Sequence, residues 1–199
     1  MKPSKTLYLI ADASDEFGRL YAKIKEAVDG GIGWLQLFNS EKAEEENLKT
    51  LQTLCKTHKV RFILHQNTAL AQRLNADGVH LDELPENFEK PSLLLVGVTV
   101  GNDLEKIKKA ANKGIDYLSF CSVFPSRSAN VCELVRPENI VQARSFFKGT
   151  LFLAGGITTQ TIPQLKNLDF QGVALISEIM EAENITEKLK ALRNELTLL

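Results

Sequence analysis

The sequence predicts an α/β protein that folds as a single-domain (β/α)8 TIM barrel. Short apolar runs alternate with helical patterns along the chain, and no linker rich in Gly, Pro or Ser interrupts the alternation. Several runs, such as residues 62–64 and 93–96, are continuously apolar, which is typical of parallel strands buried on both faces. With 199 residues, 44% of them hydrophobic, the chain can bury one core, and we expect one domain over residues 1–199.

In the first half of the chain, four apolar runs predict strands. They span residues 7–11, 34–38, 60–65 and 78–81. Helical patterns between these strands cover residues 17–28, 43–58 and 68–74, and the first of them ends before the helix-terminating pair Gly30-Gly31. Pro85 and Pro91 follow the fourth strand, so we expect no long helix there.

In the second half, four further strands are expected. They span residues 93–99, 117–120, 150–153 and 173–176. Asp103 is a suitable N-cap for a helix that ends near residue 112, and Pro137 suits the first turn of the helix after the sixth strand. The last two helices are expected at residues 158–165 and 185–196.

Charge and composition exclude several classes of protein. The formal net charge is −1 and like charges form no block, so neither nucleic acid nor an anionic membrane is expected as a partner. No segment approaches the length of a membrane helix, and the first apolar run is too short for a signal peptide. Cys55, Cys121 and Cys132 have no spacing typical of disulfides or metal sites. We expect a cytoplasmic protein.

Two strand ends near the C-terminus predict a phosphate site. The seventh run ends at Gly155 and Gly156, and the eighth ends at Ser177. Glycine lets backbone N–H groups approach an anion closely, and TIM barrels often bind phosphate with the loops after strands seven and eight. The expected ligand is therefore a small phosphorylated molecule.

Other candidate site residues follow from the same rule, because TIM barrels place their functional side chains at the carboxyl ends of strands. The full set is Asp12, Gln36, Asn39, His65, Gln66, His80, Asp82, Glu83, Thr99, Ser122, Ser126, Arg127, Ser128, Gly155, Gly156 and Ser177. The set is rich in hydroxyl and amide groups but poor in cations. A phosphate bound there would depend mainly on backbone N–H groups.

Short motifs occur in a definite order along the chain. They are Leu7-Tyr-Leu-Ile-Ala-Asp12, Gln36-Leu-Phe38, Ala76-Asp-Gly-Val-His-Leu81, Gly97-Val-Thr99, Asp116-Tyr117 with Val123-Phe-Pro-Ser-Arg-Ser-Ala129, and Gly155-Gly-Ile157 with Gly172-Val-Ala-Leu-Ile-Ser177. In kind and order they resemble the motifs of the thiamin phosphate synthase and TenI superfamily, over nearly the whole chain. The resemblance implies a TIM barrel that acts in thiamin biosynthesis.

The resemblance also implies a reaction and a cofactor. Synthases of the family join a pyrimidine methyl diphosphate to thiazole phosphate and expel pyrophosphate, which requires Mg²⁺ and cations where negative charge develops. This sequence departs from the family at those positions. Phe38 replaces an Arg, Ser40 a Lys, His65-Gln66 an Asn-Asp pair, Pro85 a metal carboxylate and Ala129 the loop Lys.

These departures argue against the usual Mg²⁺ site, and no other cofactor is expected. Asp82 and Glu83 are the candidate substitute metal ligands, and Arg127 or Lys42 could replace a lost cation. The segment between residues 124 and 136 is long enough to act as a lid over the ligand.

The phosphate end of the family site is retained. Gly155, Gly156, Ile176 and Ser177 match the family's thiazole-phosphate site, and Ser126 and Ser128 keep two loop hydroxyls. This asymmetry resembles the TenI branch, which binds thiazole phosphate without the synthase's metal site.

TenI-type tautomerases carry a catalytic His where this chain has Ser122, preceded by Cys121. His65 and His80 are the remaining candidates for proton transfer, because imidazole titrates near neutral pH. His80 also fits a structural histidine inside the barrel, and Cys121 a small core residue.

We predict a protein that binds thiazole phosphate or thiamin phosphate at the C-terminal mouth of the barrel. The assigned residues are Gln36, Thr99, Ser126, Arg127 and Ser128 for substrate, His65 and Ser128 for catalysis, Gly155, Gly156, Ile176 and Ser177 for phosphate, and Asp82 and Glu83 for a metal. Three activities remain open: a synthase with a rebuilt metal site, a TenI-like thiazole isomerase or aromatase, and a non-catalytic binding or regulatory protein. Intact architecture favours an enzyme.

Overall fold

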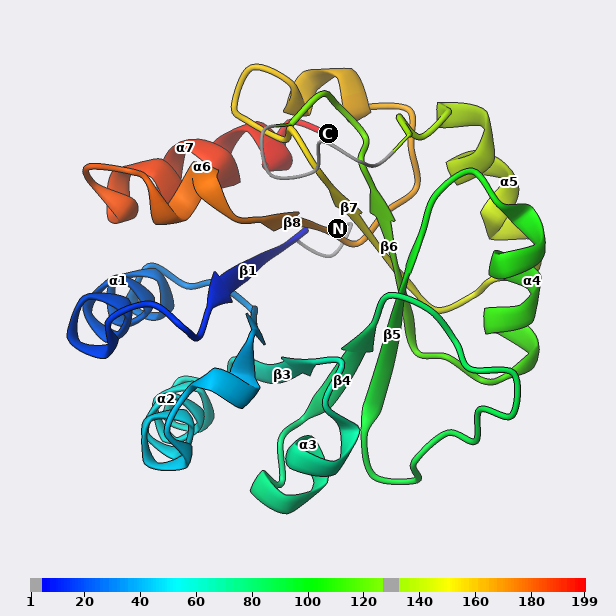
Figure 1. The fold of residues 1–199 in the computed structure, drawn as a ribbon. Helices are drawn as coiled ribbons and strands as arrows, with labels where there is room; N and C mark the ends of the chain where they lie inside the picture. The colour runs from blue at the N-terminus through cyan, green and yellow to red at the C-terminus, as the bar shows by residue number, and fades with distance from the viewer. Residues whose placement is uncertain (1–4, 127–132) are drawn as a thin grey trace.

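The computed structural model describes residues 5–126 and 133–199, and it shows a closed barrel of parallel strands (Figure 1). In chain order the strands are β1 (Thr6–Asp12), β2 (Trp34–Phe38), β3 (Arg61–His65), β4 (Gly78–Leu81), β5 (Leu95–Val100), β6 (Tyr117–Cys121), β7 (Thr150–Ala154) and β8 (Gly172–Leu175). Each strand pairs with the next, and β8 pairs with β1, where Gly172 lies opposite Thr6. The predicted (β/α)8 TIM barrel is confirmed.

Helices surround the strands on the outside of the barrel (Figure 1). They are α1 (Phe17–Asp29), α2 (Glu45–Thr57), α3 (Thr68–Leu74), α4 (Leu104–Asn112), α5 (Pro137–Phe146), α6 (Ser177–Met180) and α7 (Ile185–Thr197), with short 3-10 helices at Ser40–Lys42 and Ile162–Leu165. Within the described ranges, none of the helices combines the length and the apolar character that crossing a bilayer requires.

Several local signals in the sequence act as expected. The Asp103 carboxylate caps α4, because its Oδ1 accepts from the backbone N–H groups of Glu105 at 2.9 Å and Lys106 at 3.1 Å. Pro137 occupies the first turn of α5. The segment from β4 to β5, which contains Pro85 and Pro91, forms no helix.

Two expected elements are wrong in extent. The helix predicted at residues 158–165 is reduced to the 3-10 turn Ile162–Leu165, because Thr161 Oγ1 accepts from Thr158 N at 2.8 Å and ties the segment into a local turn. The fifth strand begins at Leu95, opposite Gly78, rather than at Leu93. The chain turns before this point, and the residue Leu93 is 93% exposed.

The core has two parts. Most buried apolar side chains lie between the strands and the surrounding helices. A smaller aromatic cluster lies inside the barrel, where Tyr8 packs on Phe152 with ring centroids 4.9 Å apart and Trp34 packs on Tyr117 at 5.0 Å. Gly97 makes room for this cluster, because a Cβ atom there would lie 2.0 Å from Cζ of Tyr117. The aromatic cluster fills the barrel interior below the strand ends that form the site.

Candidate functional site

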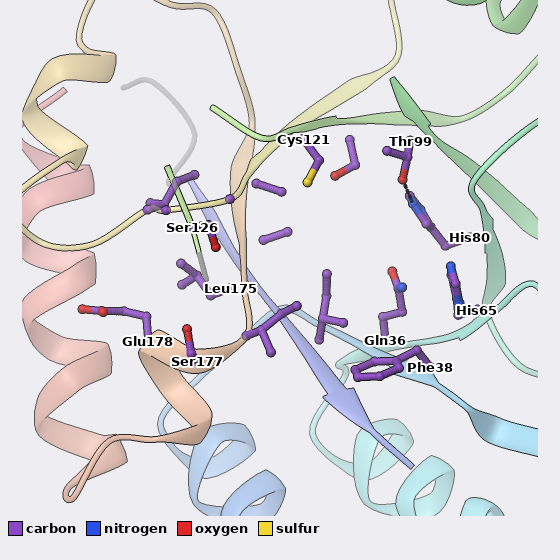
Figure 2. A pocket seen from close by; sticks show the side chains of 18 of the residues that line it. Gln36, Phe38, His65, His80, Thr99, Cys121, Ser126, Leu175, Ser177 and Glu178 are labelled. Carbon is purple, nitrogen blue, oxygen red and sulfur yellow. Dashed lines mark hydrogen bonds between the residues drawn. The ribbon is translucent and has the colours of Figure 1, made fainter. Parts of the chain in front are cut away.

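The carboxyl ends of the strands enclose a cavity of about 390 Å³ (Figure 2). Its lining comes from the barrel strands and the loops that follow them, and consists of Ile10, Gln36, Phe38, His65, His80, Asp82, Thr99, Ser119, Cys121, Ser126, Ala154, Gly155, Gly156, Ile157, Thr158, Ala174, Leu175, Ile176, Ser177 and Glu178.

Most site residues assigned from the sequence meet in this cavity. Those that line it are Gln36, His65, Asp82, Thr99, Ser126, Gly155, Gly156, Ile176 and Ser177. Glu83 lies outside the lining: its side chain is 86% exposed and its Oε1 lies 3.9 Å from Lys106 Nζ. Arg127 and Ser128 fall outside the described residues, as do Ala129 and Cys132.

One end of the cavity is formed by the backbone of two loops. Gly155 and Gly156 follow β7 with φ angles of 86° and 64°, and Ser177 follows β8. Among the described residues, no oxygen accepts from the backbone N–H groups of these three. A Cβ atom at Gly156 would lie 2.5 Å from the carbonyl oxygen of Pro125, so this backbone shape requires glycine. This end of the cavity can donate several hydrogen bonds to one anion.

The opposite end carries a hydrogen-bonded pair of a histidine and a carboxylate, with no Lys or Arg among the described lining residues. Figure 2 shows Phe38, His65 and His80 across the cavity from Ser177 and Glu178. His65 Nε2 lies 3.0 Å from Asp82 Oδ1, and Gln66 Nε2 donates to Asp82 Oδ2 at 2.5 Å. Partial burial would raise the pKa of the Asp82 carboxyl, but these two hydrogen bonds outweigh it and lower that pKa below its ordinary value. Asp82 is therefore an anion that orients the His65 ring at neutral pH.

A chain of hydrogen-bonded polar groups, all buried except the partly buried Thr99, crosses the floor of the cavity. It joins Gln36, Tyr8, Tyr117, His80 and Thr99, and we call it the buried relay. Its distances are 2.7 Å from Tyr8 OH to Gln36 Oε1, 3.1 Å between the tyrosine hydroxyls, 3.1 Å from His80 Nδ1 to Tyr117 OH and 2.8 Å from His80 Nε2 to Thr99 Oγ1.

The buried relay is uncharged at neutral pH. Burial lowers the pKa of His80 to about 3, and repulsion from His65 adds to the shift while the Asp82 charge opposes it. Burial also raises the pKa of both tyrosine hydroxyls, so each keeps its proton. The alternative that His80 is a structural histidine agrees with this arrangement.

The charges around the cavity are negative or already paired. Among its described lining residues there is no Lys or Arg, whereas Asp82 and Glu178 are carboxylates. Lys188 Nζ lies 2.8 Å from Glu178 Oε1 and compensates that charge from outside the lining. The cavity can therefore accept one anionic group at the glycine end, but it offers little positive charge to compensate a second anionic group.

The residues present do not fit the metal site expected at Asp82 and Glu83. Over residues 5–126 and 133–199, His, Cys, Asp and Glu side chains form no group of three or more able to hold a metal ion. Both Asp82 oxygens are hydrogen-bonded to His65 and Gln66, and Glu83 turns toward Lys106. The two neighbouring carboxylates thus do not converge.

Sequence comparisons decide the family. A family model described as thiamine monophosphate synthase matches residues 7–179. A thiamine-phosphate synthase of Clostridium perfringens is 32% identical over 98% of each chain. The chain belongs to the thiamine-phosphate synthase family. A thiamine-phosphate synthase of a Hydrogenobaculum species is 30% identical over 90% of this chain and 88% of its own length.

The fold of this thiamine-phosphate synthase family member agrees with a solved relative. The structure of a thiamine phosphate pyrophosphorylase from Pyrococcus furiosus superposes with a TM-score of 0.77 at 25% identity, covering 97% of this chain and 96% of that one.

Two residues of the hydrogen-bond network below the cavity were not identified from the sequence of this family member. Tyr8 and Tyr117 lie on β1 and β6, fully buried, and their hydroxyls connect Gln36 to His80. One signal was available, because a tyrosine in a buried strand needs a hydrogen-bond partner for its hydroxyl. The identity of that partner depends on how strands β1, β2, β4 and β6 face one another inside the barrel.

Proposed function

We propose that the protein binds thiazole phosphate or thiamin phosphate in the cavity, with the phosphate at the glycine end. The observation that carries this proposal is that Gly155, Gly156 and Ser177 line one cavity and that their backbone N–H groups have no acceptor among the described residues. Backbone donors of this kind bind phosphate oxygens without a cationic side chain. Membership of the thiamine-phosphate synthase family supports the choice of ligand.

The other end of the cavity favours an uncharged ring over a diphosphate. Phe38 contributes an apolar aromatic face there, and the carboxylate of Asp82 lies beside His65. A diphosphate at this end would face that negative charge without a Lys or Arg in the described lining to compensate it. The carboxylates of the described residues form no group of three or more there, so a Mg²⁺ ion would be held mainly by the phosphates of the ligand itself. The ligand is therefore a monophosphate whose heterocycle points toward Phe38.

Replacing Ser177 by aspartate tests the phosphate site. A carboxylate among the backbone donors should weaken thiamin phosphate binding by at least about 30-fold, or about 2 kcal/mol, because charge-assisted hydrogen bonds are replaced by repulsion. Binding of unphosphorylated thiamin should change little. Isothermal titration calorimetry measures both affinities.

Ser145→Asp is the matched control. Ser145 is exposed on α5, so this substitution adds the same negative charge away from the cavity. Equal thiamin phosphate affinities for Ser177→Asp and Ser145→Asp would refute the phosphate site.

The hydrogen bond between His65 and Asp82 favours a TenI-like thiazole isomerase as the chemistry. A carboxylate that holds an imidazole ring in place can make that ring a general acid/base, and His65 lines the cavity. His65 would take a proton from one carbon of the thiazole ring and return a proton to another position of the same ring. The ring neither gains nor loses protons or electrons overall, so the step needs no metal. Transfer of a pyrimidine from its diphosphate is the alternative that family membership supports.

We expect His65→Gln to slow proton exchange on thiazole phosphate by about 100-fold or more, the usual contribution of a general acid/base. Proton NMR in D₂O follows the exchange. His58→Gln removes a histidine that lies 3.9 Å from Asp29 at the surface, and should leave the rate unchanged.

The alternatives give different results with the same protein. Thiamin phosphate formed from pyrimidine methyl diphosphate and thiazole phosphate, and lost on chelation of Mg²⁺, would replace the isomerase with a synthase. Saturable binding with neither exchange nor transfer would make the protein a non-catalytic binding or regulatory relative.

A further inference from the structure

We infer that Tyr8 and Tyr117 are positioning residues, which use the buried relay to fix the donor that Gln36 and the acceptor that Thr99 present to a ligand. The inference goes beyond the phosphate site, because it concerns the polarity of the opposite half of the cavity. Only its binding readout rests on the proposed function.

The direction of the buried relay begins at Gln36. An amide oxygen can only accept a hydrogen bond, so the Tyr8 hydroxyl donates to Gln36 Oε1 at 2.7 Å. A phenol has one hydrogen, so the Tyr8 oxygen must accept from the Tyr117 hydroxyl at 3.1 Å. The Tyr117 oxygen is then left to accept from His80.

The same reasoning assigns the tautomer of His80. Nδ1 carries the proton, because Tyr117 has already committed its own hydrogen and can only accept at 3.1 Å. A neutral imidazole has one N–H, so Nε2 is an acceptor and takes the hydrogen of Thr99 at 2.8 Å. One amide oxygen thus orients four hydrogen bonds.

Burial prevents the donors and acceptors of the buried relay from exchanging their roles. Tyr8 and Tyr117 are 0% exposed, and the rings of Trp34 and Phe152 pack against both. No water can reach these hydroxyls to supply another partner, and a buried polar group without a partner is costly. In the described part of the chain, Ser40 Oγ is the one buried side-chain N or O atom without a hydrogen bond, so both tyrosine hydroxyls of the relay are satisfied.

The consequence appears where the relay meets the cavity. With its oxygen held by Tyr8, Gln36 directs its Nε2 hydrogens to a ligand, and no group of the described residues accepts from them. With its hydrogen given to His80, Thr99 offers the cavity only an acceptor. The cavity therefore selects a neutral ring edge that places an acceptor at Gln36 and a donor at Thr99.

The tautomer of His80 tests the inference without any ligand. ¹⁵N NMR of the histidine side chains distinguishes protonated from unprotonated ring nitrogens, and His58→Gln and His65→Gln variants identify the His80 signals. We expect His80 to be protonated on Nδ1 and unprotonated on Nε2. A proton on Nε2 in the unmodified protein would overturn the inference.

Tyr117→Phe then removes one link. His80 Nδ1 loses its acceptor, so we expect its proton to move to Nε2 and Thr99 to become the acceptor. Thiamin phosphate should bind about tenfold more weakly. Tyr21→Phe deletes the same atom on α1, where the ring packs on Phe17, and should change neither readout.

Tyr8→Phe gives a second route if Tyr117→Phe does not fold, because the freed Tyr117 hydrogen can then turn to His80 and shift the same tautomer. An unchanged His80 tautomer in a folded variant would refute the relay. The expected tautomers without any thiamin phosphate binding by the unmodified protein would refute the proposed ligand and leave the relay standing.

Discussion

Gly155→Ala should lower the free energy of unfolding by about 2 to 4 kcal/mol, measured by urea denaturation. Two costs combine. Its φ angle of 86° is unfavourable for a residue with a Cβ atom. That atom would also lie 2.0 Å from Ser122 Oγ and 2.8 Å from Ser122 Cα, in a well-packed loop.

Substitutions at two other glycines distinguish the cost of the backbone conformation from the cost of the steric contact. Gly114 has a φ angle of 67°, and a Cβ atom added there would meet no other atom within 4 Å, so Gly114→Ala should show only the backbone cost of about 1 kcal/mol. At Gly101 the nearest atom, the carbonyl oxygen of Cys121, would lie 3.9 Å away, and alanine should be close to neutral. If Gly155→Ala costs no more than Gly114→Ala, the contact with Ser122 does not constrain the loop.

His80 should make the protein lose stability as the pH falls. Its pKa in the folded protein is about 3, whereas an unfolded chain has the ordinary value of 6.5. Between these values the unfolded state binds more protons, so stability from this group is complete above about pH 6.5 and is lost as the pH falls toward 3. The slope is at most about 1.4 kcal/mol per pH unit.

Urea denaturation at several pH values between about 4.5 and 6.5 measures this slope above the range where carboxyl groups dominate. His80→Gln keeps hydrogen-bonding capacity but does not titrate, so its slope should be smaller. His58→Gln controls for the loss of a surface histidine, whose side chain is 38% exposed. Equal slopes for the unmodified protein and His80→Gln would contradict the burial of a neutral imidazole.

Most of the barrel could be predicted because its local signals agree with its tertiary contacts. The runs at Trp34–Phe38 and Gly78–Leu81 are strands with the predicted boundaries, since each is apolar and bounded by polar or turn-forming residues. The helix predicted at residues 158–165 was wrong because a threonine side chain competes with the helical backbone there. The short α6 helix carries too few residues to give a periodic signal.

The position of the site in the barrel was predictable, but the hydrogen-bond partners of its side chains were not. A rule about strand ends identified Gln36, His65, Asp82 and Thr99, all of which line the cavity. It could not show that Asp82 pairs with His65 while its neighbour Glu83 turns away, because adjacent residues in a loop can point in opposite directions. The buried relay is also invisible in the sequence, since its members come from five different strands.

The pairing of β1 with β8 has a consequence for synthesis of the chain. Thr6 finds its partner only when Gly172 is available, so β1 keeps an open edge while almost the whole chain is being made. An unpaired strand edge is prone to wrong pairing with other chains, and long-range pairing of this kind closes slowly. A ribosome that stalls before β8 emerges would leave a sheet that cannot close, and such truncated chains should depend on chaperones more than the finished barrel does.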